Sequence, residues 1–197
     1  MSSEISGTPA KILNAALTLL EQGGPVRMAD IARAAGISRQ ALYLHYPNRA
    51  DLLIAATRHL DEIKNIDDRL ADSRGSESGL DRLAAYIDCW AAYIPEVYGV
   101  ARALMAMKDT DAEAATAWAG RMQAFREGCE AAIRALAEDD TLAPDHSIRE
   151  ATDILWTMLS IRTWEHFRQD CGWSQERYAE TMQTMARTLL TTAPASA

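Results

Sequence analysis

The strongest constraint on the fold is the spacing of helix-breaking residues in the first 65 positions. Gly23-Gly24-Pro25, Gly36 and Pro47 divide this stretch into short segments, because glycine and proline end helices. Within each segment the apolar residues recur at helical intervals, and no sustained alternation typical of strands is found. The N-terminal part of the chain is therefore predicted to be a set of helices joined by tight turns.

The first of these helices is predicted to begin at Thr8, a good N-cap residue, with Pro9 at the first helical position. Its apolar residues fall three and four positions apart and form one face: Ile12, Ala15, Ala16, Leu19 and Leu20.

Two short helices are predicted on either side of Gly36, over about 28–35 and 39–46. Gly36 can adopt the positive φ that a tight helix exit requires. Ser38 can cap the second helix, and Pro47 ends it. The residues that face inward are small or apolar, as a helix-turn-helix unit needs: Ile31, Ala32, Ala35, Ile37 and Leu42. In such a unit the second helix lies in the major groove of DNA.

The side chains on the outer face of this second helix suit a base-reading role. Arg39 can donate two hydrogen bonds to guanine, and Gln40 can pair likewise with adenine. Ala41 allows close approach or contact with a thymine methyl group, and Tyr43 can reach a base edge or a phosphate. The alternatives are solvated positions on an ordinary helix and, for Tyr43, plain surface packing.

The junction with the next helix offers further candidates for DNA contact. His45 and Arg49 lie where one helix ends and the next begins, a place suited to binding phosphate. His45 could instead be a surface residue or a partner of Asp51. The fourth helix is predicted over about 48–65, with Asn48 as its N-cap and Asp51 in its first turn. Its buried stripe is predicted to be Leu52, Leu53, Ala56, Leu60 and Ile63.

The charge distribution is compatible with DNA binding, although the chain carries −8 overall. Between Arg27 and Arg58, five arginines stand against only Asp30 and Asp51, a local excess of three positive charges. Phosphate binding depends on this local field rather than on the total charge. An acidic body with a mildly basic N-terminal region therefore does not exclude a nucleic-acid partner.

The remainder of the chain is also predicted to be helical. The segment 71–79, ADSRGSESG, is small, polar and glycine-bearing, and it is predicted to be a linker or a long loop. Beyond it, helices are predicted at about 80–94, 96–108, 110–138, 147–170 and 174–191, with one of the breaks at Pro95. The expected fold is all-α, with about nine helices.

The stretch from Val26 to Leu53, VRMADIARAAGISRQALYLHYPNRADLL, resembles the DNA-binding signature of TetR-like (tetracycline-repressor family) transcriptional regulators. The shared features are an IA pair, an AG turn, a capped recognition helix with an LYxH core, and an aromatic and a basic residue opening the fourth helix. The resemblance implies a helix-turn-helix domain over 1–50 and a helical effector-binding and dimerisation domain over 51–197. It assigns groove reading to Arg39, Gln40, Ala41 and Tyr43, backbone contacts to His45 and Arg49, and core positions to Leu42 and Tyr46.

One position departs from the family pattern. Where the family commonly has threonine capping the second helix, this chain has Arg27 followed by Met28. This loses a side-chain cap worth about 0.5–2 kcal/mol, but it places a cation near the phosphates. The predicted DNA-binding set is therefore Arg27, Met28, Ser38, Arg39, Gln40, Ala41, Tyr43, His45 and Arg49.

A second site is expected in the C-terminal part, where all five tryptophans lie. Aromatic and methionine side chains suit an apolar small-molecule site, and the resemblance implies a pocket framed by the fifth to eighth helices. The candidates are Trp90, Ile94, Met105, Trp118, Met122, Phe125 and Trp156; the alternative for each is ordinary core packing. Arg102, Arg121 and Arg162 could be polar anchors for a ligand, but helix-surface ion pairing explains them as well.

The resemblance also implies how the chain would act. The last two helices, about 147–170 and 174–191, would form a homodimer that presents two reading heads to a palindromic double-stranded operator. Binding of a small apolar or aromatic effector would release the operator, which makes a repressor the predicted function. The sequence does not separate a repressor from an activator.

Other classes of protein find little support. The cysteines Cys89, Cys129 and Cys171 are far apart, unlike the close pairs of zinc sites, and predict free thiols in a reducing cytoplasm without metal or cofactor. Neither a signal peptide nor a run of about 20 apolar residues is found, so a soluble protein without a membrane partner is expected. No catalytic motif is found, so no catalytic residue is predicted. A helical ligand-binding or scaffold protein that does not bind DNA is the remaining alternative.

Overall fold

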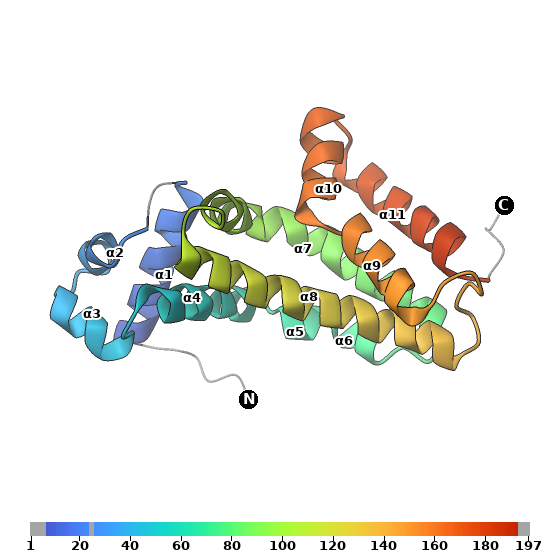
Figure 1. Cartoon of the computed structure of the whole chain (residues 1–197), viewed down its shortest axis with the longest axis horizontal. Helices are drawn as coiled ribbons and strands as arrows, with labels where there is room; N and C mark the ends of the chain where they lie inside the picture. Colours follow the sequence, from blue (N-terminus) through green and yellow to red (C-terminus); the bar gives the residue numbers. More distant parts are fainter. Residues whose placement is uncertain (1–6, 24–25, 193–197) are drawn as a thin grey trace. The chain divides into compact units, whose positions relative to one another are not determined.

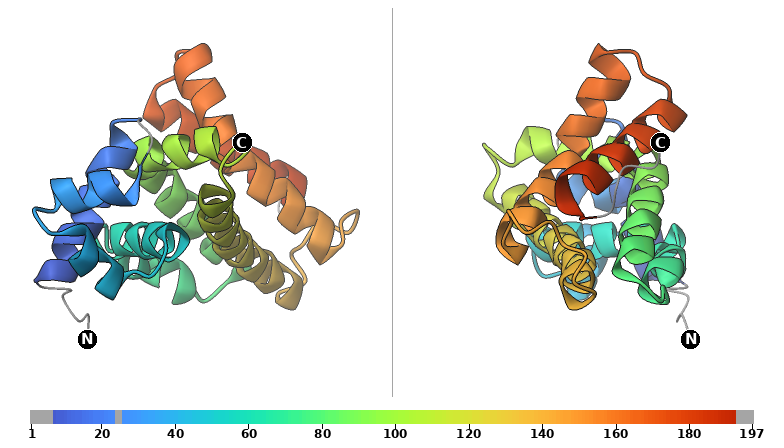
Figure 2. Two further views of the ribbon diagram at one scale, coloured as in Figure 1. Left: turned by 60° about the vertical axis from the view of Figure 1, so that its left-hand side comes forward. Right: turned by 90° about the vertical axis from the view of Figure 1, so that its right-hand side faces the viewer.

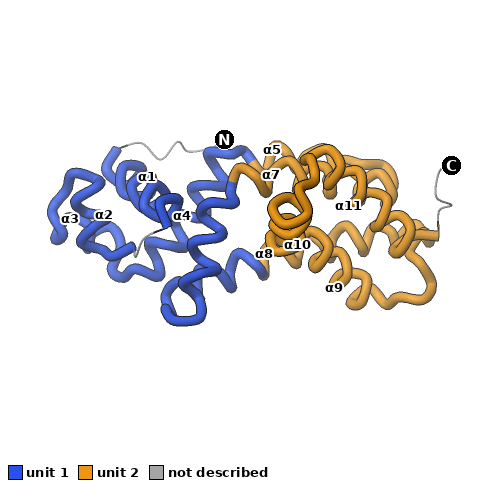
Figure 3. The backbone as a smooth tube through the Cα atoms, turned by 90° about the horizontal axis from the view of Figure 1, so that it is seen from above, with its two compact units in different colours: residues 1–65, 97–122 blue, residues 66–96, 123–197 orange. Residues whose placement is uncertain are grey.

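The computed structural model describes residues 7–23 and 26–192, and these form α-helices, one π-helical segment and connecting turns (Figure 1). The prediction of an all-α fold is confirmed for them. No helix among the described residues is long and apolar enough to cross a membrane. The chain divides into two compact units, residues 1–65 with 97–122 and residues 66–96 with 123–197 (Figure 3). Unit 1 is thus built from two separate stretches of chain, and the expected division into a helix-turn-helix domain (1–50) and an effector-binding domain (51–197) stays a prediction.

Unit 1 begins with four helices, α1 (Thr8–Glu21), α2 (Met28–Ala34), α3 (Arg39–His45) and α4 (Arg49–Ile63). Helix α1 packs against α2 and α4, and α2 packs against α3. The apolar faces expected from the sequence meet in this core: Ile12, Leu20, Ile31, Leu42, Leu52 and Leu53 are fully buried.

Two details of these helices differ from the prediction. The N-cap of α1 is Gly7, and no side chain caps the helix, so Thr8 is its first residue instead of its cap. Ile63, expected in the buried stripe of α4, is 51% exposed because it is the last residue of the helix.

Helix α7 (Gly79–Met107) is continuous, although a break was expected at Pro95. Proline has no N–H, so Pro95 cannot donate to the Ala91 carbonyl as a helical residue would. Gln175, the first residue of α11 (Gln175–Leu190), fills this place: its Nε2 donates to the Ala91 oxygen at 2.6 Å. The same side chain accepts a hydrogen bond from Trp164 Nε1 at 3.0 Å. A contact distant in sequence thus satisfies the carbonyl that the proline leaves without its helical donor.

The predicted linker 71–79 is also partly helical. Helices α5 (Ile66–Arg69) and α6 (Ala71–Arg74) precede α7. Ser73 lies within α6, is only 3% exposed, and donates from Oγ to the Arg82 carbonyl at 2.9 Å. The small polar residues that suggested a loop therefore include one that packs against the start of α7.

The helix predicted at 147–170 is interrupted. After α8 (Ala112–Glu138) come α9 (Ile148–Met158), α10 (Ile161–Glu165) and the π-helical η1 (His166–Asp170), drawn in orange in Figure 2. The break falls at Ser160, which caps α10 by accepting a hydrogen bond from the Thr163 N–H at 3.2 Å. A serine in an apolar stretch thus starts a new helix, as its N-cap preference favours.

Candidate nucleic-acid interface

Helix α3 is held in place by its cap and by one buried residue. Gly36 has φ +68°, the left-handed conformation expected at the exit of α2. Ser38 accepts a hydrogen bond from the Ala41 N–H at 3.1 Å, which confirms it as the N-cap of α3. Leu42 is 0% exposed and anchors the helix on the core, while Tyr46, also expected to face inward, is half-buried. Burial raises the pKa of the Tyr46 hydroxyl.

The opposite side of α3 faces away from the protein. Arg39, Gln40 and His45 are exposed, Tyr43 is 45% exposed, and Ala41 is half-buried. These are the positions to which base reading and backbone contact were assigned. Because their neighbour Leu42 is fixed in the core, the outward side chains are presented by a helix that cannot easily rotate.

Leu44 was missed by the sequence reasoning, yet it is the most exposed large apolar residue that the structure describes, at 84%. Its position could have been foreseen, because a residue two places after the buried Leu42 lies about 200° around the helix from it.

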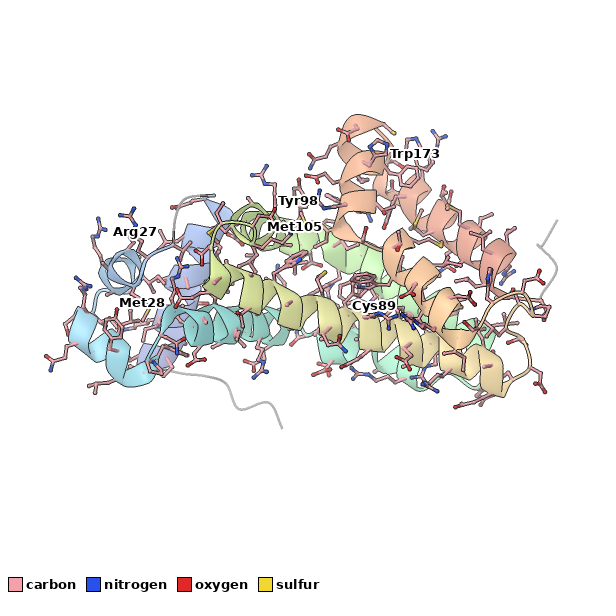
Figure 4. The ribbon with its side chains drawn as sticks, viewed as in Figure 1. Arg27, Met28, Cys89, Tyr98, Met105 and Trp173 are labelled. Atoms are coloured by element: carbon pink, nitrogen blue, oxygen red, sulfur yellow. The ribbon has the colours of Figure 1, made fainter. Side chains whose placement is uncertain are left out.

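An open recess of about 490 Å³ brings several of the predicted residues together. Arg27 precedes α2 and makes no cap, as expected, and its side chain is exposed. Met28, by contrast, is 8% exposed and faces the core, so we do not retain its side chain as a DNA contact. Figure 4 labels Arg27, just before α2, and Met28, the first residue of that helix. The recess is lined by Arg27, Met28, Ala29, Arg39, Tyr43, Pro47, Asn48, Arg49 and Glu113.

Arg49, expected to bind phosphate, is engaged inside unit 1. Its guanidinium donates to the carboxylate of Asp111, to Glu113 Oε2 at 2.8 Å and to the Val26 carbonyl at 3.0 Å. Burial alone would lower the pKa of Arg49, but the hydrogen bonds and charges of the two carboxylates raise it. Asp111 and Glu113 lie 62 and 64 residues further along the chain. We therefore assign Arg49 a positioning role at the start of α4.

Ion pairs within unit 1 decide which of the N-terminal arginines keep an uncompensated positive charge. Arg33 forms an ion pair with Asp30 on α2, and Arg49 is neutralised by Asp111 and Glu113. Among the residues that the structure describes, no ion pair engages Arg27 or Arg39. The positive charge near the recess therefore belongs mainly to these two arginines.

The N-caps expected around α3 and α4 are formed. Asn48 Oδ1 accepts from the Asp51 N–H at 2.8 Å, and Asn48 Nδ2 donates to Asp51 Oδ2 at 2.8 Å. Asp51 is thus paired with Asn48, and His45 stays exposed at the surface.

The residues proposed for an effector site are divided between the two units. Met105, Trp118 and Met122 belong to unit 1, while Trp90, Ile94, Phe125 and Trp156 belong to unit 2. Within unit 2, Trp90 lies at the centre of an aromatic cluster, with ring-centroid distances of 4.4 Å to Phe125, 5.5 Å to Tyr93 and 6.2 Å to Tyr86. Figure 4 shows the neighbouring Cys89 and, on the unit 1 part of α7, Met105.

Two of the suggested polar anchors have contacts within unit 1. Arg121 pairs with Asp61 at 2.5 Å, as the ion-pair alternative foresaw. Arg102 lies over the Tyr98 ring at 5.7 Å from its centroid. Arg162 is exposed on α10.

Comparisons with known proteins agree with this geometry. Residues 12–56 match the family described as bacterial regulatory proteins, tetR family. Over 58 residues, 29% of this chain and 31% of the relative, the chain is 40% identical to the HTH-type transcriptional repressor LfrR of Mycolicibacterium smegmatis. The matches span 31% to 38% of the length of the curated relatives, which are named as transcriptional regulators or repressors.

Solved structures extend the likeness of the fold to nearly the whole chain. A TetR-family regulator from a Rhodococcus species has a TM-score of 0.74 at 19% identity, over 93% of this chain and 98% of that one. A regulator from Saccharomonospora viridis, solved in complex with choline, has a TM-score of 0.72 at 16% identity, over 94% and 98% of the two chains. At these identities the likeness concerns the fold.

Proposed function

We propose that the chain, whose residues 12–56 match the family of bacterial regulatory proteins, tetR family, is a sequence-specific DNA-binding transcriptional regulator, and a repressor. The observation that carries this proposal is the geometry of α3. Arg39, Gln40 and Tyr43 project outward from a capped helix whose inner residue, Leu42, is fully buried. A major groove admits such a helix, and these side chain types pair with base edges there.

Contacts with the DNA phosphate backbone are made by residues that flank the outward face of α3. Arg27 lies on the same recess as Arg39 and Tyr43, without an ion pair among the described residues. Its charge suits a phosphate oxygen. His45 is exposed at the other end of α3 and offers a second phosphate contact.

The working form is a homodimer on a palindromic operator. One recognition helix reads only a few base pairs, and a two-fold dimer doubles the contacts. The helices that follow α8 supply the contact surface. On α11, Leu189 is 44% exposed, and Met185 lies one turn before it on the same face.

Control of the repressor comes from a small apolar or aromatic effector. The aromatic cluster around Trp90 supplies the kind of surface that such ligands prefer. An effector that prefers a conformation with a different spacing of the reading heads lowers operator affinity. The protein then acts on the chromosome, in the cytoplasm, without an enzymatic step.

Selection of bound fragments from random duplex DNA at physiological salt tests the proposal. The expected result is an enriched palindrome, bound at least ~1000-fold more tightly than scrambled DNA. The double variant Arg39→Ala, Tyr43→Ala should bind this duplex ~100-fold or more weakly, as the loss of two base contacts implies.

The matched control is Arg134→Ala, which removes an exposed arginine of α8 that pairs only locally with Glu130. It should leave the affinity within about 2-fold. If the folded protein enriches no sequence, the proposal is wrong, and the helical ligand-binding alternative takes its place.

A further inference from the structure

Leu44 is the most conspicuous apolar residue on the surface of unit 1. Its side chain is 84% exposed, against 51% for Ile63, 45% for Tyr43 and 44% for Leu189, the other large apolar residues exposed in the described part of the chain. An isolated exposed leucine needs no explanation on an ordinary surface. An explanation is needed on α3, where the other outward residues are polar or small, or in the case of Tyr43 carry a hydroxyl group.

The helix geometry places Leu44 next to Gln40. The two residues are four positions apart in α3 (Arg39–His45) and therefore share one face. Both lie opposite Leu42, the residue buried in the core, so they form the part of α3 that projects furthest from the protein. Ala41, three positions before Leu44, is small and leaves the space around the leucine open.

The chemistry of this pair matches one kind of base pair. A glutamine amide can bind adenine N6 and N7, and an apolar side chain can contact the thymine methyl group, the only apolar group that a base pair presents in the major groove. A leucine at the same depth as Gln40 has no hydrogen bond to offer, so guanine and cytosine edges would lose water there without compensation.

We propose that Leu44 is a specificity-determining residue that contacts a thymine methyl group, and that Gln40 and Leu44 together select an A·T-containing step in each half-site. This inference rests on the proposed function, because it assumes that α3 enters the major groove. It assigns to Leu44 a role that neither Arg39 nor Tyr43 can supply, since both of those carry polar groups.

The test replaces single thymines by deoxyuridine in the selected operator, which removes only the methyl group. In the wild-type protein, one such replacement in each half-site removes two methyl groups from the operator and should weaken binding of the dimer about 16-fold, that is, about 4-fold for each methyl-sized group left unburied. The variant Leu44→Ala loses the contact in both subunits, so it should bind the unmodified operator about 16-fold more weakly and should be insensitive to that same replacement.

Two controls isolate the contact. Ile63→Ala, which removes an exposed apolar side chain from the end of α4, should leave the affinity and the deoxyuridine effect unchanged. Circular dichroism should show Leu44→Ala folded, because an exposed side chain contributes little to the core. The proposal is overturned if Leu44→Ala keeps the full sensitivity to every deoxyuridine, or if the variant loses self-association while its DNA contacts remain. Absence of any selective DNA binding by the wild-type protein would instead refute the proposed function and this inference with it.

Discussion

At the scale of single residues, short-range chemistry determines how helix α3 is presented. The caps at Ser38 and Asn48 and the left-handed Gly36 follow from residue type and position, so the sequence predicts them well. The ion pairing of Arg49 with Asp111 and Glu113 could not be predicted in this way. Its acidic partners lie 62 and 64 residues away in sequence, and only folding brings them together.

The conformation of Gly36 leads to the first prediction. Gly36→Ala should lower the free energy of unfolding by about 1–2 kcal/mol, because alanine is strained at φ +68° although its Cβ would meet no atom within 4 Å. Gly120→Ala is the matched control: it lies in helix α8, its Cβ also meets nothing within 4 Å, and it should raise stability by about 0.5–1 kcal/mol. Urea unfolding of both variants measures these changes in the free energy of unfolding. The prediction is contradicted if both substitutions change it in the same direction.

The ion pair of Arg49 leads to a prediction about pH. Partial burial would raise the pKa of Asp111, but the hydrogen bond and charge of Arg49 and the N–H groups of Ala114 and Glu113 lower it overall. A carboxylate whose pKa is lower in the folded state stabilises the protein above its usual pKa of ~3.9, and this stabilisation is lost as the pH falls through the lowered value. Asp111→Asn should therefore cost about 1–2 kcal/mol at pH 7 and progressively less below about pH 4.

Asparagine is the right replacement because its side-chain oxygen can still accept from the N–H groups of Glu113 and Ala114, as Asp111 Oδ1 does at 3.1 Å. The change thus removes the charge and keeps the cap of α8. Chemical denaturation at a series of pH values measures the effect, and a stability difference that stays constant down to pH 2 would exclude this role for Asp111.

At the scale of elements, most helices were foreseen and their interruptions were not. Apolar periodicity is a strong local signal and placed α1 to α4, α8 and α11 within a few residues. The continuity of α7 at Pro95 was not foreseen because it depends on what the helix packs against, and the break at Ser160 was not foreseen because the N-cap preference of this one serine was overlooked. At Pro95 the partner is Gln175, whose distance in sequence hides it from any local pattern.

This arrangement predicts an energetic coupling between Gln175 and Pro95. Gln175→Ala should lower the free energy of unfolding by about 1–3 kcal/mol, since the Ala91 carbonyl and the Trp164 N–H lose a hydrogen-bond partner. In a Pro95→Ala background the loss should be smaller by about 1 kcal/mol, because the alanine that replaces the proline has an N–H that can donate to the Ala91 carbonyl.

The control for this double-mutant comparison of Gln175 and Pro95 is Gln123→Ala. Gln123 is an exposed glutamine that donates only to Glu127 on the same helix. It should change the stability by less than about 0.5 kcal/mol in either background. Strictly additive effects of Gln175→Ala and Pro95→Ala would show that the two sites are independent.

At the scale of the whole molecule, the three cysteines differ in their accessibility to solvent. Cys171 is exposed, whereas Cys89 and Cys129 are buried. Burial raises the pKa of the Cys89 thiol, and it raises the pKa of Cys129 to about 12. Because the thiolate is the reactive form, the native protein at pH 8 should react rapidly with Ellman's reagent at a single thiol.

Denaturation should bring the count of reactive thiols to three, the number in the sequence. Cys171→Ser should abolish the rapid phase and leave the slow reaction of the two buried thiols. A second rapid thiol in the native wild-type protein would show that unit 2 opens more readily than its packing indicates.

The composition of unit 1 has a consequence for anyone who would build hybrid regulators. A graft cut after the fourth helix would transfer residues 1–65 and leave behind residues 97–122, which belong to the same compact unit. The transplanted Arg49 would then arrive without Asp111 and Glu113, and its charge would meet whatever the host offers at that place. The part of this chain that we propose reads DNA is therefore not a single transferable segment. A successful hybrid must either carry both stretches or rebuild an acidic pair in its new sensor.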